Sequence, residues 1–219
     1  MFSMTNVSCY LLGERAIVID VACHIATQPK LNQKLFALKK WLDSSDAFID
    51  VVPAMSSITA YLINPEKIKQ WQQVIVEKWN DLEMDSFESK LHHISVNYGG
   101  EFGQDFGDVA NRLALTHEQL IRLHTSVDYQ VQFMGFLPGF AYLSGLPAQL
   151  HLPRKSTPIT HVPKGSIAIA DSYTAVYPCG SPGGWHLLGQ TDSTLFDAES
   201  ESVCLLQPGD TVRFVEKSC

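Results

Sequence analysis

The sequence lacks the features that mark several large classes of protein. Its five cysteines are widely spaced and form no Cys-x-x-Cys pair, which argues against a disulfide framework and predicts free thiols in a reducing compartment. The 16 Lys and Arg residues never cluster beyond a pair, and the formal net charge is −7, so nucleic-acid binding is not expected. None of the eight histidines has the spacing of a zinc site, so no metal site is expected either.

Signals for export and for membrane insertion are also missing. The N-terminus has no basic start followed by a long apolar run. The uncharged stretch over residues 129–153 contains three prolines and three glycines, which would break a spanning helix repeatedly. We therefore expect a cytoplasmic protein that makes no membrane contact.

Residues 1–88 predict a small α+β domain. Strand-like runs and helical periods follow one another in the order ββαββα, which suits a sheet with helices on one face. Pro29 fits the first turn of the first helix, and Asn64 with Pro65 begins the second. The acidic run over 81–90 is the expected linker. One helix face is marked by leucines at helical spacing: Leu31, Leu35, Leu38 and Leu42.

Residues 89–219 predict a mostly-β domain. Two short helices are expected over 105–115 and 116–126, the second opened by a capping box of Thr116 and Gln119. Elsewhere short apolar runs alternate with Gly and Pro, as in a closed or nearly closed β-barrel. The expected strands cover residues 91–98, 129–136, 166–170, 174–177, 186–188, 202–207 and 211–215.

Four Gly- and Pro-rich blocks stand out in the second domain. Loops dense in these residues are pre-shaped and expose backbone N–H groups that bind anions. Turn chemistry at barrel corners is the alternative explanation for any single Gly or Pro. The blocks cover residues 96–105, 129–146, 153–154 with 162–170, and 177–191. Their aromatic residues suit the wall of a small-molecule pocket: Phe136, Phe140, Tyr142 and Trp185.

The candidate catalytic residues are His124 and Arg154. A histidine suits acid–base chemistry near neutral pH, and a surface or helix-end histidine is the alternative. Arg154 suits a carboxylate or an acyl phosphate, and a structural salt bridge is the alternative. Asp105 either pairs with Glu101 as a second carboxylate or caps the helix that follows. The candidate substrate-binding residues are Gly135, Pro138, Gly139, Tyr142, Ser181, Gly183, Gly184, Trp185 and His186.

The blocks resemble those of a known family. Gly-Phe-x-Pro-Gly-Phe-Ala-Tyr-Leu at 135–143 and Ser-Pro-Gly-Gly-Trp at 181–185 are similar to motifs of the family that contains allophanate hydrolase subunit 1, the sporulation kinase-A inhibitor and the B subunit of 5-oxoprolinase. His124 also matches a histidine typical of that family. The resemblance implies a ferredoxin-like N-terminal domain and a cyclophilin-like β-barrel C-terminal domain. The chain departs from the family pattern at Ile159 and Gln190, where the family has arginines, and at Lys164.

The resemblance also implies a function. The B subunit of an ATP-dependent 5-oxoprolinase would act with the A and C subunits to open 5-oxo-L-proline to L-glutamate, and would be inactive alone. ATP would be a co-substrate, accompanied by Mg²⁺, at a site shared with the C subunit, because this chain has no P-loop motif. The alternatives are inhibition of a histidine kinase and processing of urea or allophanate. A prolyl isomerase is suggested by the barrel type alone, and fold does not imply function.

Overall fold

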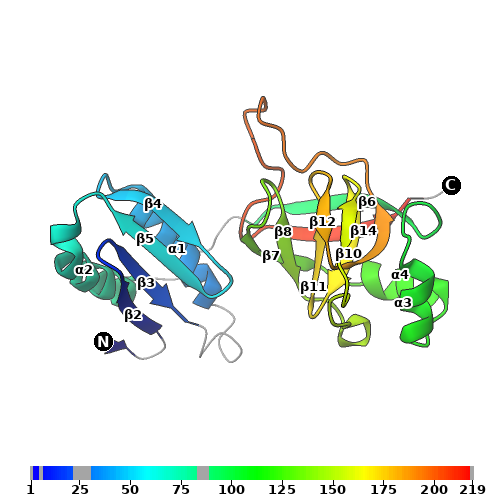
Figure 1. Cartoon of the computed structure of the whole chain (residues 1–219), viewed down its shortest axis with the longest axis horizontal. Coiled ribbons are helices and arrows are strands. Elements are labelled where there is room, and N and C mark those ends of the chain that lie inside the picture. The colour runs from blue at the N-terminus through cyan, green and yellow to red at the C-terminus, as the bar shows by residue number, and fades with distance from the viewer. Residues whose placement is uncertain (1, 5–6, 22–30, 83–88, 218–219) are drawn as a thin grey trace. The chain divides into compact units, whose positions relative to one another are not determined.

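The computed structural model describes residues 2–4, 7–21, 31–82 and 89–217. The chain divides into two compact units, residues 1–87 and 88–219 (Figure 1). Pro29 and the middle of the expected linker lie outside the described residues. Among the described helices, none is long and apolar enough to span a membrane.

The first unit is an antiparallel sheet with two helices packed on one face (Figure 1). Within the described residues the strand order is β1-β2-β3-β5-β4. Leu38 of α1 and Ile75 of α2 are buried against the inward side chains of the sheet, such as Ile17 and Ile58. The elements are β1 (Phe2–Met4), β2 (Val7–Leu12), β3 (Ala16–Asp20), α1 (Leu31–Asp43), β4 (Phe48–Pro53), β5 (Ser57–Leu62), the 3₁₀ turn η1 (Pro65–Lys67) and α2 (Ile68–Asp81).

The second unit contains a closed barrel, as expected. The strand order around the barrel is β10-β11-β8-β7-β14-β6-β13, and β9 pairs with β12 in a separate two-stranded sheet. The capping box of Thr116 and Gln119 at the start of α4 is confirmed. The elements are β6 (Leu91–Tyr98), α3 (Phe106–Arg112), α4 (His117–Thr125), β7 (Tyr129–Met134), β8 (Ala141–Ser144), the 3₁₀ turn η2 (Ala148–Leu150), β9 (Ile159–Val162), β10 (Ser166–Ala170), β11 (Tyr173–Val176), β12 (Ser181–Gly183), β13 (His186–Gln190) and β14 (Thr211–Glu216).

The barrel is closed by a parallel pair between its first and last strands. β6 and β14 run side by side from Leu91 opposite Thr211 to Val96 opposite Glu216. The other described barrel pairs are antiparallel. A parallel pair cannot be joined by a short turn, and here the connection between the two strands contains the other strands of the barrel.

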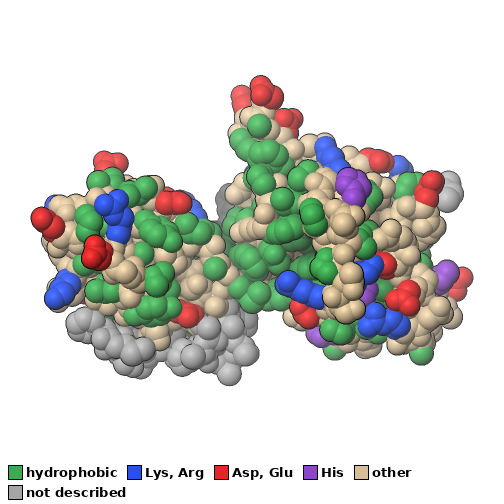
Figure 2. All heavy atoms as spheres, viewed as in Figure 1, with side chains coloured by type: hydrophobic (Ala, Val, Ile, Leu, Met, Phe, Trp, Pro, Cys, Tyr) green, Lys and Arg blue, Asp and Glu red, His purple; other side chains and the backbone are tan. Residues whose placement is uncertain are grey.

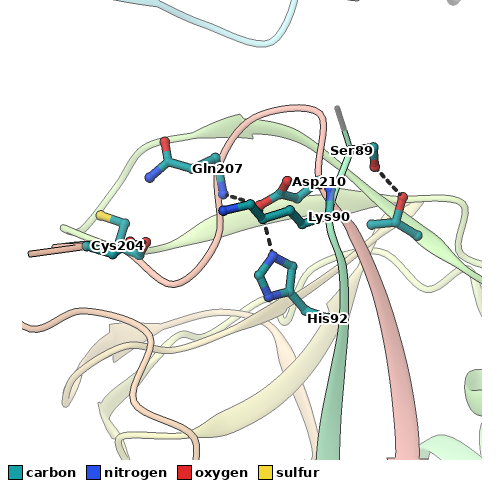
Figure 3. Close-up of polar contacts among 8 residues, drawn as sticks. Ser89, Lys90, His92, Cys204, Gln207 and Asp210 are labelled. Atoms are coloured by element: carbon teal, nitrogen blue, oxygen red, sulfur yellow. Dashed lines mark hydrogen bonds and ion pairs between the residues drawn. The ribbon is translucent and has the colours of Figure 1, made fainter. Parts of the chain in front are cut away.

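Asp210 fastens this closure (Figure 3). Its buried carboxylate accepts hydrogen bonds from the backbone N–H of Lys90 at 3.1 Å and of Gln207 at 3.0 Å. The same carboxylate lies 3.0 Å from Nε2 of His92. Asp210, which directly precedes β14, thus binds the residues on either side of Leu91, the first residue of β6.

Side chains alternate between the interior of the barrel and its outer surface. On β10, Ile167 and Ile169 point into the main core, whereas Ala168 and Ala170 point outward into a second, smaller core. The interior also takes large side chains from other strands, including Tyr129 and Phe214. Strand β10 is therefore buried on both faces, and the outer layer lies where the Gly- and Pro-rich blocks converge.

The expected strand over 202–207 is wrong. Residues 191–206 form a projecting segment with a single bridge between Phe196 and Cys204. Because the barrel is already closed, its strands leave no free edge for this segment to join. Acidic side chains gather at the tip of the projection (Figure 2), which carries Asp197, Glu199 and Glu201.

Replacing Asp210 tests how much this closure contributes to stability. Asp210→Ala should lower the free energy of unfolding by about 2–4 kcal/mol, because it leaves two backbone donors and a histidine without their acceptor. Asp128→Ala is the matched control, since Asp128 pairs with Arg213 at a half-exposed site and should lose less than about 1 kcal/mol. Urea unfolding monitored by circular dichroism measures both values. Equal losses of unfolding free energy in the two variants would contradict the role of Asp210 in holding the closure.

Candidate functional site

The loop between β7 and β8 begins with a strained turn at Phe136. The backbone N–H of Leu137 donates to the carbonyl of Gly135 at 2.9 Å, which closes a three-residue γ-turn. Phe136 at its centre has a φ of 72°, a conformation that is unfavourable for a bulky residue. The residue is 60% exposed. The turn thus holds a large apolar ring out at the surface.

A second turn completes the same loop and explains its Pro-Gly pair. The N–H of Phe140 donates to the carbonyl of Leu137 at 3.0 Å, and Gly139 has a φ of 80°. Pro138 and Gly139 therefore occupy the two central positions of a type II turn, where proline and glycine are favoured. A side chain on Gly139 would also meet the Cβ of Phe196 at 2.7 Å. The block is thus a pair of tight turns.

The outer side of the barrel carries a cluster of rings, most of which belong to the second core, that we term the aromatic face. Phe133 stacks on Tyr142 with ring centroids 4.1 Å apart. Phe140 meets the rings of Tyr142 and Trp185 edge-on, at 5.0 Å and 5.9 Å. Such edge-on contacts are favourable because the positive edge of one ring faces the negative face of another. The aromatic face comprises Phe133, Phe136, Phe140, Tyr142, Tyr173, Tyr177 and Trp185.

The Ser-Pro-Gly-Gly-Trp block lies against this face because its glycines leave room. A side chain on Gly183 would meet the hydroxyl oxygen of Tyr177 at 2.5 Å. The carbonyl of Gly184 accepts a hydrogen bond from the N–H of Lys155 at 2.7 Å. Ser181 is buried in β12, opposite Val162 of β9. The block therefore packs against the aromatic face at Tyr177 and also holds the segment that carries Arg154.

Arg154 lies at the edge of the aromatic face. Its guanidinium carbon is 6.0 Å from the centroid of the Trp185 ring, and its Nε atom is 3.4 Å from Oδ2 of Asp171. Burial raises the pKa of Tyr177 to about 12, and the nearby Tyr142 adds to the rise while the charge of Arg154 opposes it. Burial likewise raises the pKa of Tyr142, again against the charge of Arg154. Both hydroxyls are therefore neutral hydrogen-bond donors near pH 7.

Asp105 does not cap the helix that follows it, which corrects one of the two expectations for this residue. It occupies the N-cap position of α3, but its side chain makes no capping hydrogen bond. Its carboxylate instead accepts from the N–H of Leu187 at 2.8 Å and pairs with Nζ of Lys155. Asp105 thus ties β13 to the segment 153–155, next to Arg154.

His186 is buried beside the same segment. Its Nε2 atom lies 2.9 Å from the carbonyl oxygen of Pro153, so this nitrogen carries the proton and donates. Its Nδ1 atom is buried and has no hydrogen-bond partner among the described residues. His186 therefore holds Pro153 in place, and its ring is closed off from solvent.

His124 lies inside the barrel, fully buried and stacked on Phe214. The hydroxyl of Thr174 donates to the carbonyl of Ala168, so it accepts from Nε2–H of His124 at 3.1 Å. Nδ1 must then accept from the hydroxyl of Tyr98 at 2.7 Å. Burial lowers the pKa of His124 to about 3. This neutral, satisfied histidine is neither at the surface nor placed to exchange protons with a substrate, which argues against the expected acid–base role.

The structure brings most of the expected site residues together and leaves His124 apart. Arg154, Tyr142 and Trp185 share the aromatic face, and the candidate Gly and Pro residues shape its loops. Sequence reasoning missed Asp171 and Tyr177. Tyr177 lies in a Gly- and Pro-rich block and is recognisable as a candidate there. No spacing links Asp171 to Arg154, because the two meet through a turn and an irregular segment.

Comparisons with known proteins define the class first. Residues 7–206 match the family described as carboxyltransferase domain, subdomain C and D. The protein TTHA0988, whose crystal structure has been solved, is 31% identical in sequence to this chain. The two structures superpose with a TM-score of 0.81, and the match covers 94% of this chain and 40% of that chain. The urea amidolyase of Kluyveromyces lactis is 14% identical with a TM-score of 0.70, covers 97% of this chain and 15% of that chain, and shares the fold alone. The fold is thus that of a carboxyltransferase domain.

Curated relatives identify the family within this class. The 5-oxoprolinase B subunit from Escherichia coli O157:H7 is 38% identical over 220 residues, which cover 97% of each chain. A protein of the same name from Haemophilus influenzae is 39% identical over 197 residues, covering 89% of this chain and 92% of the relative. The chain belongs to the family of 5-oxoprolinase B subunits, which confirms the resemblance found in its motifs.

The buried His124 predicts a specific pH dependence of stability. Its folded pKa of about 3 lies below the ordinary value of 6.5, so the unfolded chain binds a proton that the folded chain does not. The stabilising contribution is therefore complete above pH 6.5 and is lost progressively as the pH falls toward 3. In that window the free energy of unfolding should fall by about 1.4 kcal/mol per pH unit from this group.

His124→Gln removes the titrating group and keeps a neutral hydrogen-bonding side chain. Urea unfolding of both proteins between neutral and mildly acidic pH should show a steeper loss of stability in the wild-type chain. The difference between the two slopes isolates His124, because the remaining groups titrate in both proteins. Identical slopes would mean that His124 is protonated as readily in the folded state as in the unfolded one.

Proposed function

We propose that this chain is the B subunit of an ATP-dependent 5-oxoprolinase that opens 5-oxo-L-proline to L-glutamate together with the A and C subunits. The observation that carries the proposal is the identity of 38–39% along nearly the whole chain to proteins named as 5-oxoprolinase B subunits. The aromatic face supplies a surface that suits such chemistry in physical terms. It offers a cation, neutral hydroxyl donors and apolar rings within one cluster.

The roles of the residues follow from the chemistry of the substrate. A lactam carboxylic acid carries one negative charge, a polar amide and a small apolar ring. Arg154 would bind the carboxylate, because a guanidinium matches a carboxylate with two parallel hydrogen bonds. Tyr142, which is partly buried, would donate to an oxygen atom of the lactam, where negative charge develops during opening, and the buried Tyr177 would pack behind it. Phe136, which is exposed, would pack on the ring and keep water from it.

ATP is proposed as the co-substrate that makes opening favourable. Transfer of its terminal phosphoryl group to the lactam oxygen would give an activated species that water then opens, releasing phosphate. Among the described residues no group of three or more His, Cys, Asp or Glu could hold a metal ion. Mg²⁺ bound to ATP would therefore be held by the phosphates and by residues of another protein of the complex, in line with a nucleotide site shared with the C subunit.

The remaining finer expectations stay predictions. The N-terminal unit is proposed to be ferredoxin-like, because its order β2-β3-β5-β4 becomes that of a split βαβ sheet if β2 is placed after α2. The cyclophilin-like type of the barrel and a cytoplasmic location of the protein are also proposals. Kinase inhibition and urea or allophanate processing are the alternatives, and the curated relatives do not favour them.

A reconstituted assay tests the proposal. Glutamate released from 5-oxoproline in the presence of ATP should require this chain together with the A and C subunits, with each left out in turn. Full activity without this chain, or none with all three folded proteins present, would contradict the proposal.

Arg154 is the residue to test within that assay. Arg154→Ala should lower kcat/KM for 5-oxoproline roughly 10- to 100-fold, because a hydrogen-bonded charge pair with the substrate is lost. Arg213→Ala is the matched control, since Arg213 also forms an exposed pair with an aspartate but lies outside the aromatic face. Equal values of kcat/KM in the two variants would show that Arg154 does not bind the substrate.

A further inference from the structure

Arg154 has an acidic neighbour that no expected role explains. Oδ2 of Asp171 lies 3.4 Å from Nε of Arg154, and the two side chains are 61% and 54% exposed. An exposed ion pair at this separation is weak, because water and salt screen both charges. An anionic group of a ligand can therefore take the place of Asp171 at the guanidinium.

The backbone keeps Asp171 opposite Arg154. Asp171 is the first residue of the two-residue turn between β10 and β11, and its φ of 53° is tolerated by aspartate and asparagine. Its backbone N–H donates to the carbonyl of Leu152 at 2.6 Å, two residues before Arg154. The turn is thus fastened to the segment that carries the arginine, and the carboxylate stays within reach of the guanidinium.

The guanidinium of Arg154 also lies against the aromatic face. It lies over the ring of Trp185, and its charge opposes the rise in the pKa values of Tyr142 and Tyr177. The carboxylate of a ligand seated on these rings would approach Arg154 and meet the negative charge of Asp171 there. Asp171 would therefore act against the binding of an anion here in two ways, by occupying the guanidinium and by repelling the ligand.

We propose that Asp171 is a specificity-determining residue, whose carboxylate competes with the carboxylate of a small cyclic amide for Arg154 and so sets substrate affinity. That the ligand is a lactam carboxylic acid rests on the proposed function. The competition requires the ion pair to open before the substrate is bound. It selects for ligands that carry a carboxylate strong enough to displace Asp171, and it leaves the affinity for neutral lactams unchanged.

The test neutralises Asp171 while keeping its shape. Asp171→Asn preserves the turn, because asparagine accepts the same backbone conformation. In the assembled complex this variant should lower the KM for 5-oxoproline by about two- to fivefold, the range expected for removing one exposed competing ion pair. The value of kcat should change by less than about twofold, because Asp171 is not placed to act on the reacting atoms.

Two controls separate this competition from a general effect of charge. Asp128→Asn neutralises an acid in another exposed Arg–Asp pair of the same unit and should leave KM unchanged. Combining Asp171→Asn with Arg154→Gln should abolish the gain, because the competition acts only through the arginine. A gain that persists in the double variant would overturn the inference, as would an unchanged or higher KM in Asp171→Asn.

Binding to the free chain separates this inference from the proposed function. NMR titration with 5-oxoproline and with 2-pyrrolidinone, the same ring without a carboxylate, uses no other protein. Tighter binding of 5-oxoproline alone by Asp171→Asn supports the competition even if the assembled complex releases no glutamate. Equal binding of 5-oxoproline by both proteins, or no binding to either, overturns it, even if the reconstituted enzyme is active.

Discussion

The pairing of β6 with β14 is the constraint on which the second unit depends. These two strands are separated by more than a hundred residues, yet they lie side by side and close the barrel. Closure removes every free strand edge from the barrel and encloses the main core. It also fixes which side chains of each strand face outward, and so it determines where the aromatic face is built. The carboxylate of Asp210 holds the strands at the point where they begin to run together.

The outward face of β10 shows how a barrel wall accommodates the aromatic face. Ala168 and Ala170 are small, so aromatic rings from the neighbouring strands and loops approach the backbone closely. Gly183 leaves space for the hydroxyl of Tyr177 in the same way. The aromatic face therefore depends on small residues beneath and above it as much as on the rings themselves. Their close packing restricts the rings of the aromatic face.

Local signals in the sequence were sufficient for much of the fold. The capping box at Thr116, the strand over 91–98 and the closed barrel were all predicted, because periodicity and caps are encoded by neighbouring residues. The strand over 202–207 failed because an apolar run forms a strand only where an edge is available to pair with it. The burial of His124 was also hidden, since its partners Tyr98 and Thr174 lie 26 and 50 residues away. The link between Asp171 and Arg154 has the same non-local origin.

The parallel pair that closes the barrel has a consequence for biosynthesis. Because β14 lies between β6 and β7, neither of these strands can complete its pairing until residue 216 has left the ribosome. Until then the nascent chain exposes unpaired edges and a large apolar interior, both of which favour aggregation. A truncated product that lacks β14 would remain in this open state. The cell would therefore be expected to degrade such fragments or hold them on chaperones, rather than accumulate them as folded half-barrels.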